Sequence, residues 1–375
     1  MNPRHACLIA AMCLQVLVAL TLAGCGGSSQ ISSPSQPASP SEFLYAETLK
    51  GITAFPVDPS SGALGSGTLV TSGVFLGNFF TGMATDPASK FLFAFGLPGT
   101  GLEAFSIDAS TGGLTAASGS PYAIPGSGAS LAIDPTGQFV YAVTTAGVTA
   151  FALKSATAGL SAIAGSPFSD GSVLRAAAVD PSGKFLYASG NTTQITLSVF
   201  AINSSSGALT PVVGSPFLSP INSAAESIVV HPSGKFLYVS LPFADGIAAW
   251  GINSATGALT IVPGSPFATG HGLPNLVVEP SGKFLYALNY NDGTVSGFSV
   301  DAKSGALTAV NGSPFAVSAS PLYLATDSSG QFLYAANGST ITGFDINTSS
   351  GELTAFSTPP FPAEGAQALT VAKIP

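Results

Sequence analysis

Blocks of apolar and polar residues follow one another across residues 275–315, and they predict four short β-strands. The apolar run "LVV" is followed by a polar Pro-Ser-Gly-Lys turn at 280–283. The next segment, "FLYALN", is nearly all apolar, as expected of a strand that is buried on both faces. After the hairpin signal Asn-Asp-Gly, "TVSGFSV" alternates like a half-buried strand, and "LTAV" follows a further polar turn. Four such strands without a helical period are typical of one β-propeller blade.

The same unit recurs along the whole chain. The heptapeptide "PSGKFLY" occurs at 181–187, 232–238 and 280–286, and its Phe-Leu-Tyr element has seven versions. These begin at Phe43, Phe91, Phe139, Phe185, Phe236, Phe284 and Phe332. The near-constant spacing between these starting positions indicates a solenoid or a propeller. The strand content favours an all-β propeller with seven blades of four antiparallel strands.

The two ends of the repeat predict how the ring closes. The first unit starts at its second strand, "FLYAET", and the chain ends with "ALTVAKI", which is a first strand with no second strand after it. Pairing these two segments completes one blade and removes both open strand edges. We therefore expect the C-terminal strand to join the N-terminal blade.

The heptapeptide is predicted to have a structural role. Pro cannot donate to a strand ladder, and Gly supplies the turn geometry. The lysine is expected to be a solvated turn residue rather than a phosphate ligand. Phe, Leu and Tyr are expected to fill the space between adjacent blades.

Composition adds limits to this prediction. Only 7% of the 375 residues are charged, 46% are hydrophobic, and Gly and Pro are abundant, which argues against disorder. The net charge of -8 disfavours a nucleic acid partner, because such a surface repels phosphate backbones.

The N-terminus is predicted to be a targeting segment. Arg4 and His5 precede a largely apolar run that ends in Leu-Ala-Gly-Cys at 22–25. This ending resembles the bacterial lipobox, which implies that Cys25 becomes the acylated first residue. An ordinary signal peptide with a coincidental Cys is the alternative. The predicted organisation is a signal peptide at 1–24, a lipidated Cys and Gly/Ser/Pro linker at 25–42, and the propeller at 43–375.

Cysteine use agrees with that organisation. Cys7 and Cys13 lie in the predicted signal, and Cys25 is the third and last cysteine. The mature chain then has no disulfide and no thiolate metal site. We expect no cofactor and no metal, since no carboxylate cluster has calcium-loop spacing and no paired zinc histidines occur.

The unit "P-S-G-K-F-L-Y-x-x-N … F-x-x-D-x-x-S-G-x-L-T" resembles the seven-bladed lactonase family, which includes 6-phosphogluconolactonase-like and muconate cycloisomerase-like propellers, and YVTN-type repeats are similar. The resemblance covers about residues 43–373. It implies an active site of Arg, His and Glu at the mouth of the central channel. Arg175 and Glu226 match this pattern, whereas Ala176 replaces the His. Leu241-Pro242-Phe243 and Asn275 stand where the family has further arginines.

The residues that do not repeat are the best functional candidates. The position five residues before the Asp of each "DP" turn, or its equivalent, is expected to ring one face of the channel. It holds Thr81, Ala129, Arg175, Glu226, Pro274, Leu322 and Gln367. Arg175 and Glu226 either orient a polar ligand or form an internal ion pair that only rigidifies the mouth. His271 lies in a connection to the same face, where it is either a general base or a surface residue.

Two functions follow from these residues. The first is a binding or scaffold propeller with a degenerate active site, whose partner is a small polar ligand, a glycan or an envelope protein. The second is a lactonase that hydrolyses a sugar lactone. In that enzyme Arg175 stabilises the oxyanion, Glu226 helps to activate water, and His271 substitutes for the missing His. We expect a monomer in the bacterial cell envelope, at the outer membrane or cell surface, that contacts the membrane only through its lipid anchor.

Overall fold

The computed structural model describes residues 40–71, 82–95, 101–190, 194–221, 223–272, 275–317 and 320–374, which belong to one compact unit spanning Ser39–Pro375. This unit is all β. The predicted signal segment and Cys25 lie outside the described residues. Among those described, no helix is long and apolar enough to cross a membrane.

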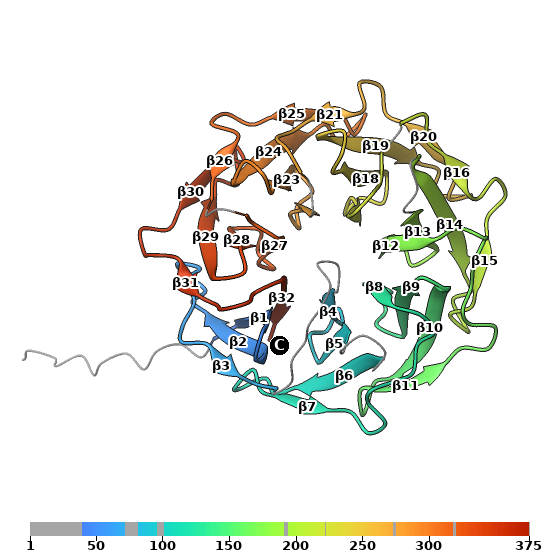
Figure 1. Ribbon diagram of the computed structural model, residues 1–375, viewed down its shortest axis with the longest axis horizontal. Helices are drawn as coiled ribbons and strands as arrows, with labels where there is room; N and C mark the ends of the chain where they lie inside the picture. The colour runs from blue at the N-terminus through green and yellow to red at the C-terminus, as the bar shows by residue number, and fades with distance from the viewer. Residues whose placement is uncertain are drawn as a thin grey trace, which may run out of the picture. The chain divides into compact units, whose positions relative to one another are not determined.

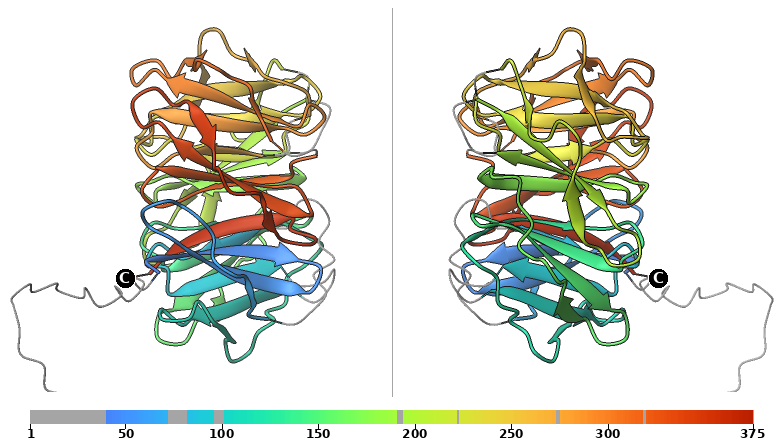
Figure 2. Two further views of the ribbon diagram at one scale, coloured as in Figure 1. Left: turned by 90° about the vertical axis from the view of Figure 1, so that its left-hand side faces the viewer. Right: turned by 90° about the vertical axis from the view of Figure 1, so that its right-hand side faces the viewer.

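Seven antiparallel sheets surround a central channel, which confirms the seven-bladed propeller (Figure 1). In the side views, the strands run across the thickness of the ring (Figure 2). Blade 1 contains β32 (Ala368–Lys373), β1 (Glu42–Thr48), β2 (Gly51–Val57) and β3 (Thr68–Leu69), from the inside outward. Blade 2 contains β4 (Met83–Thr85), β5 (Phe91–Phe95), β6 (Leu102–Ile107) and β7 (Leu114–Ala116). Blade 3 contains β8 (Gly128–Ile133), β9 (Phe139–Thr144), β10 (Gly147–Lys154) and β11 (Gly159–Ala162).

The remaining blades carry an additional short strand on their third strand. Blade 4 contains β12 (Leu174–Val179), β13 (Phe185–Gly190), β14 (Thr196–Ile202), β15 (Leu209–Pro211) and β16 (Phe217–Leu218). Blade 5 contains β17 (Ile228–Val230), β18 (Phe236–Leu241), β19 (Gly246–Ile252), β20 (Leu259–Ile261) and β21 (Phe267–Ala268). Blade 6 contains β22 (Leu276–Val278), β23 (Phe284–Asn289), β24 (Thr294–Val300), β25 (Leu307–Ala309) and β26 (Phe315–Ala316). Blade 7 contains β27 (Tyr323–Thr326), β28 (Phe332–Ala336), β29 (Thr340–Ile346), β30 (Leu353–Ala355) and β31 (Phe361–Pro362).

The fourth position of a blade is therefore filled in two pieces. A Ser of the repeated "GSPF" segment lies between the pieces, and its hydroxyl accepts a backbone N–H from the third strand. Ser265 Oγ accepts from Ala249 N at 2.9 Å, and Ser313 Oγ accepts from Gly297 N at 3.0 Å. The segment thus continues the edge of the blade instead of ending it.

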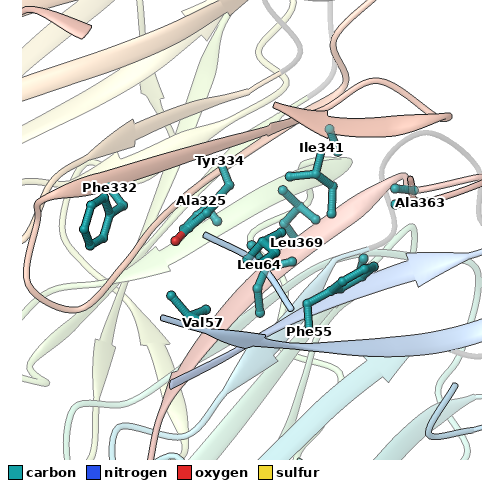
Figure 3. Close-up of a cluster of buried hydrophobic side chains, with 13 residues drawn as sticks. Phe55, Val57, Leu64, Ala325, Phe332, Tyr334, Ile341, Ala363 and Leu369 are labelled. Carbon is teal, nitrogen blue, oxygen red and sulfur yellow. The ribbon is translucent and has the colours of Figure 1, made fainter. Parts of the chain in front are cut away.

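The ring closes as the sequence predicts. β32 pairs with β1 in antiparallel register from Glu42↔Lys373 to Glu47↔Ala368. Glu42, which the sequence boundary places in the linker, is the first residue of β1. Leu369 from the C-terminal strand packs with Leu44 and Phe55 of blade 1 and with Tyr334 and Ile341 of blade 7 (Figure 3). The last strand therefore contributes apolar side chains to the core as well as pairing with β1 in the sheet.

The acid before each "P-S-G-K" turn explains why this turn recurs. Asp180 is buried, and its Oδ1 accepts the backbone N–H groups of Lys184 and Phe185 at 2.8 and 2.7 Å. His231 takes this place in blade 5, where Nδ1 lies 2.8 Å from Ser233 Oγ and Nε2 lies 2.7 Å from Gly282 O. His231 is thus a turn residue, and the lysines of these turns are exposed.

The Phe and Tyr of the heptapeptide contact a turn of the next blade. In blade 5, the Tyr238 hydroxyl donates to Gly305 O at 2.9 Å, and Gly305 lies in the turn between the third and fourth strands of blade 6. A Cβ on Gly305, whose φ is +76°, would lie 2.4 Å from the ring of Phe236. The aromatic repeat and the "S-G" repeat are therefore two halves of one contact between blades, since only Gly fits beneath the ring.

Tyr238→Phe is expected to lower the free energy of unfolding by about 1–2 kcal/mol, because it leaves the buried Gly305 carbonyl without its donor. Tyr187 provides a matched control, because its buried hydroxyl has no hydrogen-bond partner within the described part of the chain. Tyr187→Phe should leave stability unchanged or raise it slightly. Urea unfolding of both variants measures the difference, and equal losses would contradict this account.

Candidate functional site

The central channel holds a cavity of about 430 Å³. The innermost strand of every blade contributes to its wall, together with residues just before some of these strands. The innermost strands all begin at one end of the ring, and the hairpins between the second and third strands lie at the same end. We call this end the mouth. Of the described residues that line the cavity, Glu226 alone is charged.

Arg175 is placed by a β-bulge at the start of β12. Leu174 pairs with Gly190 and Ala176 with Ser189, so Arg175 is the extra residue between two ladder pairs. The same irregularity occurs in β8 at Ala129, which holds the equivalent position. A bulge redirects a side chain away from the regular pleat, and here the residue concerned is an arginine at the mouth.

Glu226 lies just before β17 in the neighbouring blade, within reach of Arg175. Arg175 Nη2 is 3.8 Å from Glu226 Oε1, and the two side chains are 19% and 16% exposed. Burial raises the pKa of Glu226 more than the Arg175 charge lowers it. The sequence prediction that these two positions share one face of the channel is therefore confirmed.

His271 belongs to a different cluster at the mouth end. Its Nδ1 lies 3.0 Å from Asp292 Oδ1, and its Nε2 lies 3.9 Å from Asp245 Oδ2. The side chain is 67% exposed, and the hydrogen bond with Asp292 raises the His271 pKa. Asp245 and Asp292 come from the hairpins of blades 5 and 6. Thus the structure brings Arg175 and Glu226 together, while the described contacts of His271 are with these hairpins.

Hydrogen bonds between blades fix the wall of the cavity. In blades 3, 5 and 6, the side chain four residues before the turn residue Asp134, His231 or Glu279 accepts a backbone N–H of the next innermost strand. Ser227 Oγ accepts from Leu276 N at 3.4 Å, and Asn275 Oδ1 accepts from Leu324 N at 3.0 Å. The wall is thereby held by neutral groups.

Sequence reasoning missed an acid at the mouth end of blade 1. Glu47 is 2% exposed, and its Oε1 has no hydrogen-bond partner among the described residues. Burial raises the pKa of Glu47 to about 8. Alignment of the repeats could have revealed Glu47, because the residues at the same position of the other blades are uncharged. They are Phe95, Val143, Ser189, Ser240, Leu288 and Ala336.

Of the other predicted ring positions, Ala129 and Leu322 are apolar, and the buried Oε1 of Gln367 has no hydrogen-bond partner among the described residues. Thr81 and Pro274 of the predicted ring are outside them. Within the described ranges, no group of three or more His, Cys, Asp or Glu could hold a metal ion.

The chain matches one protein family. The family model described as "Lactonase, 7-bladed beta-propeller" matches residues 130–319, about half of the chain. Among curated proteins, no sequence matches significantly.

Solved structures share the fold at low sequence identity. A periplasmic gluconolactonase from Pseudomonas aeruginosa has a TM-score of 0.69 at 16% identity, covering 89% of this chain and 99% of that one. A proposed 6-phosphogluconolactonase from Bacteroides fragilis has a TM-score of 0.70 at 19% identity, with coverage of 89% and 99%. One from Bacteroides uniformis has a TM-score of 0.71 at 17% identity, with coverage of 88% and 99%. At these identities the likeness establishes the fold.

Proposed function

Since the chain belongs to the lactonase family of seven-bladed β-propellers, we propose that it binds a small neutral polyhydroxylated ligand in the central cavity. One observation carries this proposal. The Arg175–Glu226 pair stands at the mouth of a cavity that is otherwise lined by uncharged groups. A sugar hydroxyl can donate to Glu226 and accept from Arg175 without separating the two charges.

Binding is favoured over the family's hydrolysis because the other expected polar groups are engaged elsewhere or replaced. His231 is fixed in its turn, and the contacts of His271 are with Asp292 and Asp245. Ala176 follows Arg175 where the resemblance implies a His. An arginine that is already neutralised by Glu226 stabilises a developing oxyanion less than an unpaired arginine would.

Hydrolysis of a neutral sugar lactone is the second candidate function. It is favoured by the raised pKa of Glu226, because a carboxyl group that titrates closer to neutrality is a better proton donor or acceptor at working pH. In this case Arg175 polarises the lactone carbonyl, and Glu226 accepts a proton from the attacking water.

Proton release at constant pH during incubation with glucono-1,5-lactone separates the two functions. If the protein only binds, wild type, Arg175→Ala and Glu226→Gln will all show the spontaneous rate. If it catalyses, wild type will exceed that rate, and each variant should lose at least about tenfold in rate. The hydrolysis-resistant D-glucono-1,5-lactam should bind wild type in calorimetry. Loss of this binding in both folded variants is expected, whereas undiminished binding would contradict the proposed site.

We also propose that the chain is exported and anchored through a lipid on Cys25. The apolar run that ends in Leu-Ala-Gly-Cys supports this proposal. When the full chain is expressed in a bacterial host with labelled palmitate, the label is expected on wild type and absent from Cys25→Ser. Labelling of both proteins would refute the anchor.

A further inference from the structure

Tyr323 has a larger side chain than the residue at the same register position of any other blade. It pairs with Ala336 at the start of β27, four residues before Asp327. The corresponding residues of the other blades are Gly82, Ser130, Ala176, Ser227, Asn275 and Ala368. The bulk of Tyr323 therefore needs an explanation other than the repeat.

The ring of Tyr323 extends from blade 7 across the start of the C-terminal strand. It lines the cavity, and it packs against two separate core clusters. One cluster lies between blades 7 and 1 and includes Leu369, and the other lies between blades 1 and 2 and includes Met83. A residue that contacts both must lie over β32, which separates them. Tyr323 thus narrows the cavity on the side of blade 1.

Glu47 and Tyr323 both lie at the mouth end of β32. Tyr323 packs against the core clusters on both sides of this strand, and Glu47 pairs with Ala368, its first residue. After burial, the Glu47 charge is the second cause that raises the pKa of the Tyr323 hydroxyl. Glu47 is paired with the small Ala368, and its backbone oxygen accepts from Gln367 N at 3.0 Å. Paired residues of antiparallel strands share a face, so the Glu47 side chain stands on the face of blade 1 where the small Ala368 leaves room.

This wall faces the charged pair. In a ring of seven, blade 1 lies opposite the junction of blades 4 and 5, which carry Arg175 and Glu226. Figure 1 shows β32 across the channel from β12. A ligand in the cavity therefore lies between a charged pair on one side and an aromatic ring on the other. Such an arrangement suits a sugar ring, which has polar edges and an apolar C–H face.

We propose that Tyr323 sets the size of the ligand that the cavity accepts, limiting it to a single neutral sugar ring, and that Glu47 is the positioning residue that holds Tyr323 in place. This inference rests on the proposed function and adds its selectivity. Phosphorylated sugars are excluded by charge, because Glu226 is the only charged group among the described lining residues and Arg175 is already paired with it.

Calorimetry with two hydrolysis-resistant probes tests the size limit. These are D-glucono-1,5-lactam, which has one ring, and cellobiono-1,5-lactam, which has two. We expect wild type to bind the one-ring probe at least tenfold more tightly. Tyr323→Ser introduces the residue type that blade 5 has at the same position, Ser227. This variant should reduce that preference at least fivefold. Tyr290→Ser is the matched control, because Tyr290 is an exposed tyrosine outside the cavity lining, and it should keep the preference.

Tyr323→Trp serves if the serine variant fails to fold. The larger ring should weaken binding of the one-ring probe at least fivefold, and unchanged binding would count against the size limit. If wild type binds the one-ring probe but both Tyr323 variants keep its preference, the inference is wrong and the proposed function stands. If wild type binds neither probe, the proposed function is wrong, and the size limit is lost with it.

The role of Glu47 is tested by rescue. Glu47→Gln keeps the shape of the side chain and should keep the wild-type preference. Glu47→Ala leaves a gap beside Tyr323 and should reduce the preference at least threefold, with the fold checked by circular dichroism. Equal preferences in the two variants would remove Glu47 from the proposal and leave Tyr323 in it.

Discussion

Deletion of residues 366–375 is expected to abolish cooperative folding. The deletion removes β32, which supplies the innermost strand of blade 1 and six register pairs with β1. It also removes Leu369 from the core between blades 7 and 1, and Ala368 and Ala372 from the core between blades 1 and 2. Losing contacts at two blade junctions together exceeds the usual stability margin of about 5–15 kcal/mol. It also opens the β1 edge, which invites aggregation.

Thermal unfolding followed by circular dichroism, together with size-exclusion chromatography, measures this effect. A deletion of equal length at 29–38 is the control, because it keeps every strand of the propeller and should leave the transition unchanged. A monomeric protein with the wild-type melting temperature after loss of residues 366–375 would show that the closure contributes little.

Glu47→Gln is expected to raise the free energy of unfolding by about 3 kcal/mol at pH 7. The pKa of Glu47 is raised from 4.5 to about 8 in the folded state, so the native protein holds a proton that the unfolded chain has released. Between these two values, each pH unit therefore costs the native state about 1.4 kcal/mol. The stabilising contribution of neutral Glu47 is complete below about pH 4.5 and is lost as the pH rises through about 8.

Urea unfolding of both proteins from pH 5 to pH 9 tests this expectation. Glu42, Glu103 and Glu226 also have raised pKa values because of burial, so both proteins should lose stability as the pH rises. The difference between the two proteins isolates Glu47 and should grow up to about pH 8 and then level off. A difference that does not change with pH would mean that Glu47 is solvated in the folded protein.

Glu47 and Tyr323 connect stability with the proposed function. A buried, unpaired carboxyl group is costly, and residues with such costs concentrate at functional sites. If Glu47→Gln is more stable and keeps the ligand preference, the acid is needed for shape alone. If it loses the preference, the shape of the side chain does not account for the role of Glu47.

The fold of this protein can be predicted from its sequence. Seven copies of one strand pattern define seven blades, and unmatched half-units at the two ends define the closure. These inferences succeed because repeat spacing and apolar alternation are local properties that the chain displays directly. The position of Arg175 and Glu226 on one face also followed from the repeat, since equal positions in neighbouring blades must lie side by side.

Which of the remaining polar residues lie together can be seen in the folded protein alone. His271 looks like a partner of Arg175 in the sequence, but its contacts are with Asp292 and Asp245 in neighbouring hairpins. Glu47 looks like an ordinary strand residue, and its burial depends on Ala368, which lies 321 positions later and is brought to it by ring closure. The ionisation of a carboxyl group and the room around a tyrosine depend on neighbours from other blades, and these neighbours are specified by packing and not by any local pattern.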